Sequence, residues 1–555
     1  MHRTKTNQVL IMMKTNRLTN RLNIKLGLVL LLCLCFAAIG EAKISLPYLI
    51  NDGMVLQHGK AVPIWGTADA GESVTLKFAG KEYQTTAGPD GNWKIMLPAM
   101  KAGGPYDMQI NDITLHNILI GDVFLCSGQS NMELTVARVM DMFADEINAY
   151  ENTNIHYLKV PYCYDFNEPQ KDIKKAEWQP LDKTHVMGYS ALCYFFAKQL
   201  YEKTKVPVGI INSSWGGTPI EAWISEEGLQ DFPVYTHQKA VYESKELINN
   251  IQQIEQARGR AWQIELYKTD KGTHAQTPWY AENYDDSAWQ TVDMFSPQWA
   301  TNGWRPINGV HWFRQQIDLP ASWNGKEATL RLGCIVDADS VYVNGKFVGS
   351  VAYQYPPRIY NIPKGLLKTG KNQITIRLVS NGGLPSFVKD KPYKLICGTE
   401  ETNLSQQWKH RIGTEMPQAP SSTAFQNMPI GLYNGMIAPL RNYVFKGTVW
   451  YQGESNTGKW KEYASLLKSL MKDWRKTFGM PEMPFYIMEL ADFMAPDNPG
   501  RKGWAALQAQ QAKAAEEDPH ATLIPNKDTG EWNDIHPLDK KTGGKRLVEA
   551  VTQSF

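Results

Sequence analysis

The sequence contains little cysteine and almost no excess charge of either sign. Seven of its 555 residues are cysteine, and 58 basic against 56 acidic residues leave a net charge of +2. Proteins that bind nucleic acid usually have a basic surface or a large positive charge. This chain is almost neutral, so nucleic acid is not an expected partner. The five cysteines after residue 42 are widely spaced and follow neither a disulfide framework nor the spacing of a zinc site. We therefore expect no metal and no cofactor.

Long apolar runs are also scarce, and the one from Leu26 to Ile39 lies near the N-terminus. Basic residues up to Lys25 precede it, and Gly40 and Ala42 supply the small residues of a cleavage site. The run is shorter than the roughly 20 apolar residues that a spanning helix needs. We therefore expect residues 1–42 to be a signal peptide, the protein to be periplasmic or extracellular, and the mature chain to have no membrane span.

The length of the chain predicts several folding units, because a single core stops growing at about 250–300 residues. Short alternating stretches broken by turns over residues 43–120 predict a leading β-sandwich. Strands and helices alternate over residues 121–276 and again over 398–555, as in an α/β domain. Residues 277–397 return to short strands. We therefore expect a second all-β domain inserted into the α/β domain.

The inserted region has a strong hairpin signal but no catalytic group. Asn344 and Gly345 separate two short β-type runs and form the preferred two-residue turn of a hairpin. No part of residues 277–397 pairs a nucleophile with a base, so we expect the chemistry to lie outside this domain.

A strand, a tight turn and a helix start meet at residues 121–133, which read Gly-Asp-Val-Phe-Leu-Cys-Ser-Gly-Gln-Ser-Asn-Met-Glu. The apolar run Val123 to Cys126 predicts a buried strand, and a helix-compatible segment follows Ser130. In an α/β protein such a turn lies at the carboxyl edge of the sheet, where free backbone N–H groups favour an anion. Ser130 is therefore a candidate nucleophile. The alternative is that Ser127 or Ser130 only caps the helix.

Three further segments directly follow predicted strands, and they contain Gly216 and Gly217, Gln452, and His536. Parallel α/β sheets build their sites at this edge. Ester hydrolysis needs a nucleophile, a base and donors for the oxyanion, and these residues together with Ser130 supply each type. Two glycines allow backbone N–H groups to approach a ligand closely. The alternative for the glycine pair is an ordinary loop.

Four motifs in this order resemble those of the sialate O-acetylesterases, a family of the SGNH or GDSL-type hydrolase superfamily. The motifs are Gly128–Met132, Gly216–Trp223, Trp450–Asn456 and Asp534–Pro537. The resemblance implies a flavodoxin-like three-layer α/β domain of the SGNH type with a leading β-sandwich. It also implies that the inserted domain is a β jelly roll, similar to the sugar-binding-like domain of some glycoside hydrolases.

The resemblance also implies roles for the site residues. Ser130 would be the nucleophile and His536 the base. The oxyanion donors would be the backbone N–H of Ser130, an N–H of Gly216 or Gly217, and the side-chain amide of Gln452. The substrate would be an O-acetylated carbohydrate, with sialic acid as the first expectation and a plant polysaccharide such as xylan or pectin as the alternative.

Four residues are candidates for the acidic partner of His536. The superfamily commonly places an aspartate three residues before the histidine, where this chain has Asn533, and Asp534 lies two before. We predict Asp534, with Glu454, Asp528 and Asn533 as the alternatives.

Two other functional classes compete with an esterase. A glycosidase needs two carboxylates across the scissile bond, and Glu454 with Asp534 is the available pair. A non-catalytic carbohydrate-binding protein would account for both β domains without using His536. The sequence does not indicate an oligomeric state.

Overall fold

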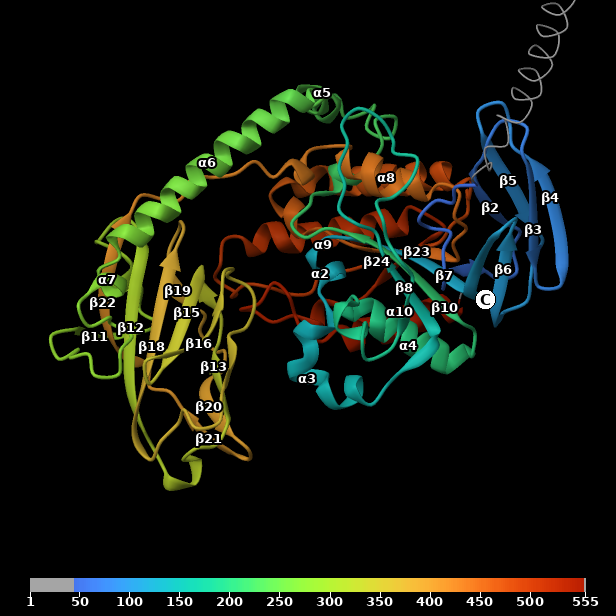
Figure 1. Ribbon diagram of the computed structural model, residues 1–555. Coiled ribbons are helices and arrows are strands. Elements are labelled where there is room, and N and C mark those ends of the chain that lie inside the picture. Colours follow the sequence, from blue (N-terminus) through green and yellow to red (C-terminus); the bar gives the residue numbers. More distant parts are fainter. Residues whose placement is uncertain (1–43, 554–555) are drawn as a thin grey trace, which may run out of the picture.

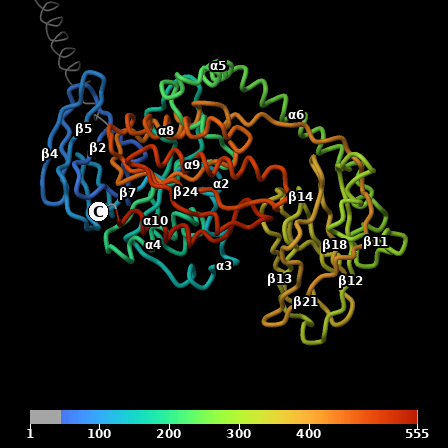
Figure 2. Tube along the Cα trace, turned by 180° about the vertical axis from the view of Figure 1, so that it is seen from behind, coloured from blue at the N-terminus to red at the C-terminus, as the bar shows by residue number. Residues whose placement is uncertain are grey.

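A computed structural model describes residues 44–553, which form three parts arranged in a row (Figure 1). A small N-terminal β region lies on one side of a central α/β part, and the inserted β domain lies on the other side, as the reverse view in Figure 2 also shows. Helix α6 (Lys245–Thr269) runs from the central part to the inserted domain. The predicted signal peptide, residues 1–42, lies outside the described residues.

The N-terminal region consists of short antiparallel strands with alternating burial. Every second side chain of β3 and of β5 is buried, as a period of two predicts. Strands β2 and β5 pair with each other, whereas β3, β4, β6 and β1 join a sheet that continues into β7. The strands are β1 (Val55–Gln57), β2 (Val62–Thr67), β3 (Ser73–Phe78), β4 (Lys81–Thr86), β5 (Asn92–Leu97), β6 (Gly103–Ile110) and β7 (Ile113–Gly128).

The central part contains a sheet in the order β25-β24-β23-β7-β10-β8-β9. All neighbouring strands are parallel except β9, which runs antiparallel to β8. Its remaining strands are β8 (Asn152–Lys159), β9 (Gln179–Leu181), β10 (Val208–Ser214), β23 (Gly447–Tyr451), β24 (Phe485–Met488) and β25 (Ala521–Ile524). The side chains of β10 and β23 are buried throughout, because helices cover both faces of the sheet.

Helices α4 and α10 pack against each other on one side of the central sheet, and α8 and α9 lie on the other side (Figures 1 and 2). Helix α4 begins after Ser190, whose side chain caps it by accepting a hydrogen bond from the Cys193 N–H. The helices are α2 (Ser130–Glu133), α3 (Val136–Asn148), α4 (Ala191–Thr204), α5 (Pro233–Val241), α7 (Lys271–His274), α8 (Tyr463–Phe478), α9 (Arg501–Glu516) and α10 (Lys540–Gln553).

The inserted domain contains a six-stranded sheet in the order β11-β22-β12-β18-β15-β16 and a four-stranded sheet in the order β17-β13-β20-β21. Strands β14 and β19 form a further pair. The strands are β11 (Gln290–Asp293), β12 (Asn308–Leu319), β13 (Ala328–Leu332), β14 (Ile335–Val336), β15 (Ala338–Val343), β16 (Lys346–Val351), β17 (Ile359–Ile362), β18 (Gly370–Ser380), β19 (Ser386–Phe387), β20 (Tyr393–Cys397), β21 (Glu400–Asn403) and β22 (Gln407–Met416).

The predicted hairpin of the inserted domain is confirmed. Strands β15 and β16 pair with Val343 opposite Lys346. Asn344 and Gly345 both have positive φ angles, 49° and 78°, which is the geometry that favours this residue pair.

Strand pairing differs from the predicted domain boundaries in two places. Strand β7 is continuous from Ile113 to Gly128 and crosses the boundary at 120, because its first half pairs in the N-terminal region and its second half in the central sheet. Strand β22 extends the inserted β domain to Met416, beyond the boundary at 397, because it fills the place between β11 and β12.

Hydrophobic packing joins the first two parts and separates the third. One core runs through the N-terminal region and the α/β part, and a second core of Trp, Leu, Ile and Val residues fills the inserted domain. Within residues 44–553, no helix combines the length and the apolar character needed to span a membrane.

Candidate active site

Ser130 lies at the carboxyl edge of the central sheet, where β7 ends and the short helix α2 begins. The turn requires Gly128, since its φ is +136° and a Cβ there would lie 2.0 Å from the carbonyl oxygen of Tyr451. As the first residue of α2, Ser130 has a backbone N–H without an intrahelical acceptor. The close packing of β7 against β23 therefore presents the serine on a tight strand-to-helix turn.

His536 reaches Ser130 from the loop between β25 and α10. Its Nε2 lies 2.8 Å from Ser130 Oγ, within hydrogen-bond distance. In the tautomer with the proton on Nδ1, the hydroxyl donates this bond to Nε2. His536 is only 4% exposed, and its ring makes an edge-on contact with Tyr355, with ring centres 5.0 Å apart. The structure thus brings together the two residues that the sequence pairs as nucleophile and base.

The electrostatic environment keeps His536 neutral. Burial lowers the pKa of His536 to about 3, and the positive charges of Lys540 and Arg138 act in the same direction. A neutral imidazole can accept the hydroxyl proton of Ser130, so the ring is in the form that a base requires.

This shift predicts an unusually acidic limit of activity. Because only the neutral ring acts as a base, a lowered pKa extends the active range downward in pH. We expect kcat/KM for an aryl acetate to stay constant below pH 6.5 and to fall only as the pH approaches about 3. Initial rates measured within the time over which circular dichroism is unchanged test this. A half-maximal rate near pH 6.5 would show that the histidine titrates as in water.

The candidate acidic partners occupy different places around His536. An oxygen of Asp534 accepts the backbone N–H of His536 at 2.8 Å, and its other oxygen lies 3.2 Å from Lys391 Nζ. Asn533 donates to the Lys389 carbonyl at 2.8 Å. Within residues 44–553, the buried Nδ1 of His536 has no hydrogen-bond partner. Asp534 therefore holds the backbone of the histidine loop rather than the ring.

Asp528 and Glu454 each contact residues other than His536. Asp528 is paired with Arg546 through two contacts of 2.6 and 2.7 Å. Glu454 is 8% exposed, and burial raises the pKa of its carboxyl. One of its oxygens accepts from Asn131 at 2.6 Å, whereas the other has no partner in the described part of the chain.

Asn131 is a site residue that the sequence reasoning does not single out, although it stands inside the serine motif. Its amide donates to Glu454 and, at 2.9 Å, to the carbonyl of Ile535. Its oxygen accepts from Lys540 at 2.6 Å. Asn131 therefore ties the serine turn to the end of β23, to the histidine loop and to the start of α10. Its position next to Ser130 is the only signal that could have indicated this role.

The glycine pair lies beside Ser130, but its two N–H groups differ. A Cβ on Gly216 would lie 3.4 Å from the Cβ of Ser130, so the two backbones are close. The Gly216 N–H donates to Glu133 at 2.7 Å. Gly217 has a φ of +76°, and among the described residues nothing accepts its N–H. Gly217 and Ser130 thus retain backbone donors for an oxyanion.

Gln452 is fully buried and its amide is occupied by the protein. Its Nε2 lies 2.7 Å from an oxygen of Asn456 and 3.2 Å from both Gln129 Oε1 and the Thr218 carbonyl. Its oxygen accepts from Tyr463 at 2.8 Å. The oxyanion role predicted for Gln452 requires a free N–H, and in this arrangement its donors join the segments around Ser130 instead.

We expect Gln452→Ala to reduce stability. The substitution removes buried hydrogen bonds to Asn456 and Tyr463 and opens a cavity, at a cost of about 2–4 kcal/mol. Urea unfolding measures this difference directly. Unchanged stability together with a turnover lowered by about a hundredfold would instead identify Gln452 as an oxyanion donor.

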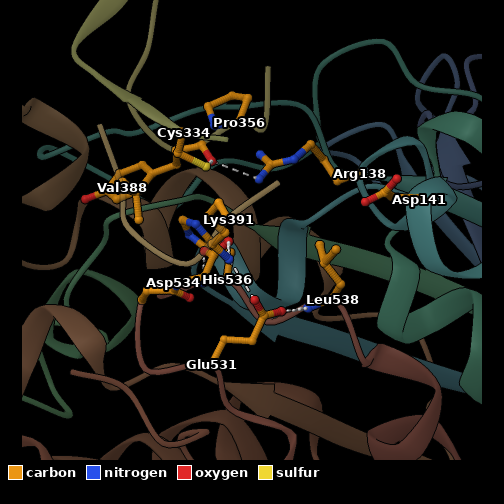
Figure 3. Close-up of polar contacts among 12 residues, drawn as sticks. Arg138, Asp141, Cys334, Pro356, Val388, Lys391, Glu531, Asp534, His536 and Leu538 are labelled. Carbon is orange, nitrogen blue, oxygen red and sulfur yellow. Dashed lines mark hydrogen bonds and ion pairs between the residues drawn. The ribbon is translucent and has the colours of Figure 1, made fainter. Parts of the chain in front are cut away.

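The inserted domain borders this site. Figure 3 shows Cys334, Pro356, Val388 and Lys391 gathered next to the loop that carries Glu531, Asp534 and His536. Lys391 Nζ lies 2.7 Å from Glu531 and also contacts Asp534. A cavity of about 230 Å³ lies between the two parts at this place.

The chain matches a known esterase family over more than half of its length. The family is described as "Carbohydrate esterase, sialic acid-specific acetylesterase", and the match covers residues 120–265 and 401–553. These residues include Ser130 and His536. The chain belongs to this carbohydrate esterase family.

Individual relatives are similar over shorter stretches. Sialate O-acetylesterases of Rattus norvegicus and Homo sapiens are 32% and 33% identical to this chain over 202 residues, which is 33% of this chain and 37% and 39% of theirs. The matches thus span less than half of these relatives. A crystal structure of a carbohydrate acetylesterase from Xanthomonas citri shares the fold, with a TM-score of 0.55 and 22% identity over 92% of this chain and 75% of that protein.

Proposed function

We propose that the protein is a serine esterase that removes O-acetyl groups from carbohydrates. The observation that carries this proposal is the 2.8 Å hydrogen bond between Ser130 Oγ and the neutral ring of His536 at the carboxyl edge of the sheet. Membership of the carbohydrate esterase family supports the same reaction class.

The site suits acyl transfer in two steps. His536 takes the hydroxyl proton while Ser130 Oγ attacks the acetyl carbonyl, and the resulting oxyanion is bound by the N–H groups of Ser130 and Gly217. Collapse of the intermediate breaks the bond to the sugar oxygen, which takes the proton from His536 and leaves as a hydroxyl, so the acetyl group remains on Ser130. Water then attacks that ester with His536 again as the base, so acetate leaves and Ser130 is restored.

We also propose the finer assignments of the fold and the cellular location. The parallel sheet with helices on both sides supports a flavodoxin-like three-layer domain of the SGNH type. The two larger antiparallel sheets of the inserted domain support a jelly roll. The basic and apolar N-terminal sequence supports export to the periplasm or the cell exterior.

Sialic acid is the first candidate for the acetylated sugar, since the relatives are named sialate O-acetylesterases. Acetylated xylan or pectin is the alternative. A glycosidase would use Glu454 and Asp534, but Asp534 is bound to the His536 N–H and to Lys391, and one oxygen of Glu454 is bound to Asn131. A binding protein would not need the contact between Ser130 and His536.

Product analysis separates these classes. We expect the protein to release acetate from an aryl acetate and from an O-acetylated sugar without cleaving glycosidic bonds. Release of reducing sugar without acetate would identify a glycosidase. Sugar binding without any product would identify a binding protein.

We propose Asp534 as the acidic residue that supports His536, through the loop backbone and its negative charge. Asp534→Asn keeps an acceptor for the His536 N–H but removes the charge, so we expect turnover to fall by about 10- to 100-fold. Glu454→Gln, the matched change at the other buried carboxylate, should cost less. Steady-state kinetics of both variants tests this, and a larger loss in Glu454→Gln than in Asp534→Asn would reassign the acid.

A further inference from the structure

Several residues of the inserted β domain contact the loop that carries His536. Lys391 pairs with Glu531 and Asp534, and the Lys389 carbonyl accepts from Asn533 at 2.8 Å. These contacts join the connection between β19 and β20 to the segment that positions the base (Figure 3). The inserted domain therefore has a fixed position relative to the serine site.

A second segment of the inserted domain reaches the reacting pair. Tyr355, between β16 and β17, places its ring edge-on to His536 at 5.0 Å. Its carbonyl oxygen accepts from Arg138 of α3 at 3.4 Å and from the Cys334 thiol at 3.4 Å. This segment is thus held from both the hydrolase side and its own domain.

Tyr353, two residues earlier, is 52% exposed, and its ring centre lies 5.1 Å from that of Tyr355. Burial and the neighbouring Tyr355 raise the pKa of its phenol, and the charges of Arg138 and Glu133 act on that pKa as well. Because the Tyr355 ring contacts the rings of both Tyr353 and His536, Tyr353 lies one ring away from the base, with a large part of its side chain open to solvent.

A second aromatic pair belongs to the hydrolase domain and lies beside Glu133, at the end of the short helix that begins at Ser130. The rings of Tyr162 and Trp215 are stacked, 4.2 Å apart and 21° from parallel. The Tyr162 hydroxyl donates to Glu133, the residue that also accepts the Gly216 N–H. Tyr162 is 44% exposed. Aromatic rings from two domains thus lie around the turn that carries the nucleophile.

Exposed tyrosines suit a sugar. A pyranose ring presents an apolar face of C–H groups and an edge of hydroxyls, and a tyrosine presents an apolar ring with a polar tip. Binding sites for small molecules combine aromatic walls with a few polar groups in this way. A small ester without a ring would gain nothing from such a contact.

We propose that the inserted β domain forms a wall of the substrate site, with Tyr353 packing against the sugar ring that carries the acetyl group. This inference rests on the proposed esterase function. It gives the inserted domain a role in substrate selection, whereas the reacting groups belong to the α/β domain.

Tyr353 is the informative position, because Tyr355 contacts His536 and a change there would disturb the base. We would compare Tyr353→Ala, Tyr353→Phe and Phe347→Ala, which alters another exposed aromatic residue of the same domain, 59% exposed. Each variant is assayed in the full-length protein with an O-acetylated sugar and with vinyl acetate, an activated acetate ester that has no ring.

In Tyr353→Ala we expect kcat/KM for the acetylated sugar to fall by about tenfold, mainly through KM, with vinyl acetate hydrolysis unchanged. Tyr353→Phe retains the ring and should stay within about threefold of the wild type, and Phe347→Ala should match the wild type on both esters. An equal loss on both esters, or no loss on the sugar, would overturn the inference.

The proposed function fails separately from this inference. If the wild-type protein hydrolyses neither ester, the esterase proposal is refuted and the inference with it. If it hydrolyses vinyl acetate but no acetylated sugar, the wall for a sugar is refuted while the esterase chemistry stands.

Discussion

Ser130→Ala is expected to abolish hydrolysis of an aryl acetate, with turnover lower by about 10⁴-fold or more. The substitution removes the oxygen that lies 2.8 Å from His536 Nε2, so no acetyl-enzyme can form. The turn itself should persist, because Gly128 and the contacts of Asn131 hold it independently of the serine hydroxyl. Turnover and circular dichroism of the variant measure the two effects separately.

Ser127→Ala is the matched control for this experiment. Ser127 lies three residues earlier, on β7, is fully buried, and donates its hydroxyl to the Ser213 carbonyl at 2.5 Å. It should therefore retain turnover near that of the wild type. Retained activity in Ser130→Ala, or equal losses in both variants, would end the assignment of Ser130 as the nucleophile.

The second large effect is expected from His536→Ala. Without the ring, the hydroxyl proton of Ser130 has no acceptor at 2.8 Å, and turnover should fall by about as much as in Ser130→Ala. Because the two side chains act as a unit, the double variant should be no slower than either single variant. Steady-state kinetics of the three variants tests this non-additivity.

His185→Ala provides a comparison in the same chain, since its ring binds a carboxylate, Asp182, at 2.8 Å. It should leave turnover close to the wild-type value. A His536→Ala variant that keeps more than about a tenth of wild-type turnover would contradict a role as the base. Additive losses in the double variant would show that the two residues act separately.

Residues near the strand ends were predictable because the relevant pattern is local. The run before Ser130 identifies a buried strand, and the helix-compatible sequence after it places the serine at the sheet edge. The Asn344-Gly345 turn was equally clear, because both residues tolerate positive φ. The pairing of Ser130 with His536 followed once both were placed at the same edge of a parallel sheet.

The direction of individual side chains was not predictable in this way. The position of Gln452 at a strand end does not indicate the direction of its side-chain amide. The amide points into the protein, where oxygens of Asn456, Gln129 and Thr218 accept its hydrogen bonds. Asp534 is adjacent to His536 in sequence, yet its carboxylate is drawn to a backbone N–H and to Lys391.

Contacts between residues far apart in the sequence were also not predictable. Tyr355 and Lys391 belong to the inserted domain, and the sequence contains no local sign that they lie against the histidine loop. Strand β22 looks like the start of the next domain in sequence, whereas its place in the sheet depends on β11 and β12. Such contacts depend on how the two domains pack against each other. No local pattern of apolar and polar residues indicates that packing.

The measurement that tests the proposed chemistry most directly is the mass of the protein during turnover. An aryl acetate is mixed with the enzyme, the reaction is quenched in acid within the first turnovers, and the intact mass and the peptide masses are determined. A serine acyl-enzyme predicts one added acetyl group on the peptide that contains Ser130, absent from Ser130→Ala. An acetyl group on another residue that forms and decays at the rate of turnover would contradict it.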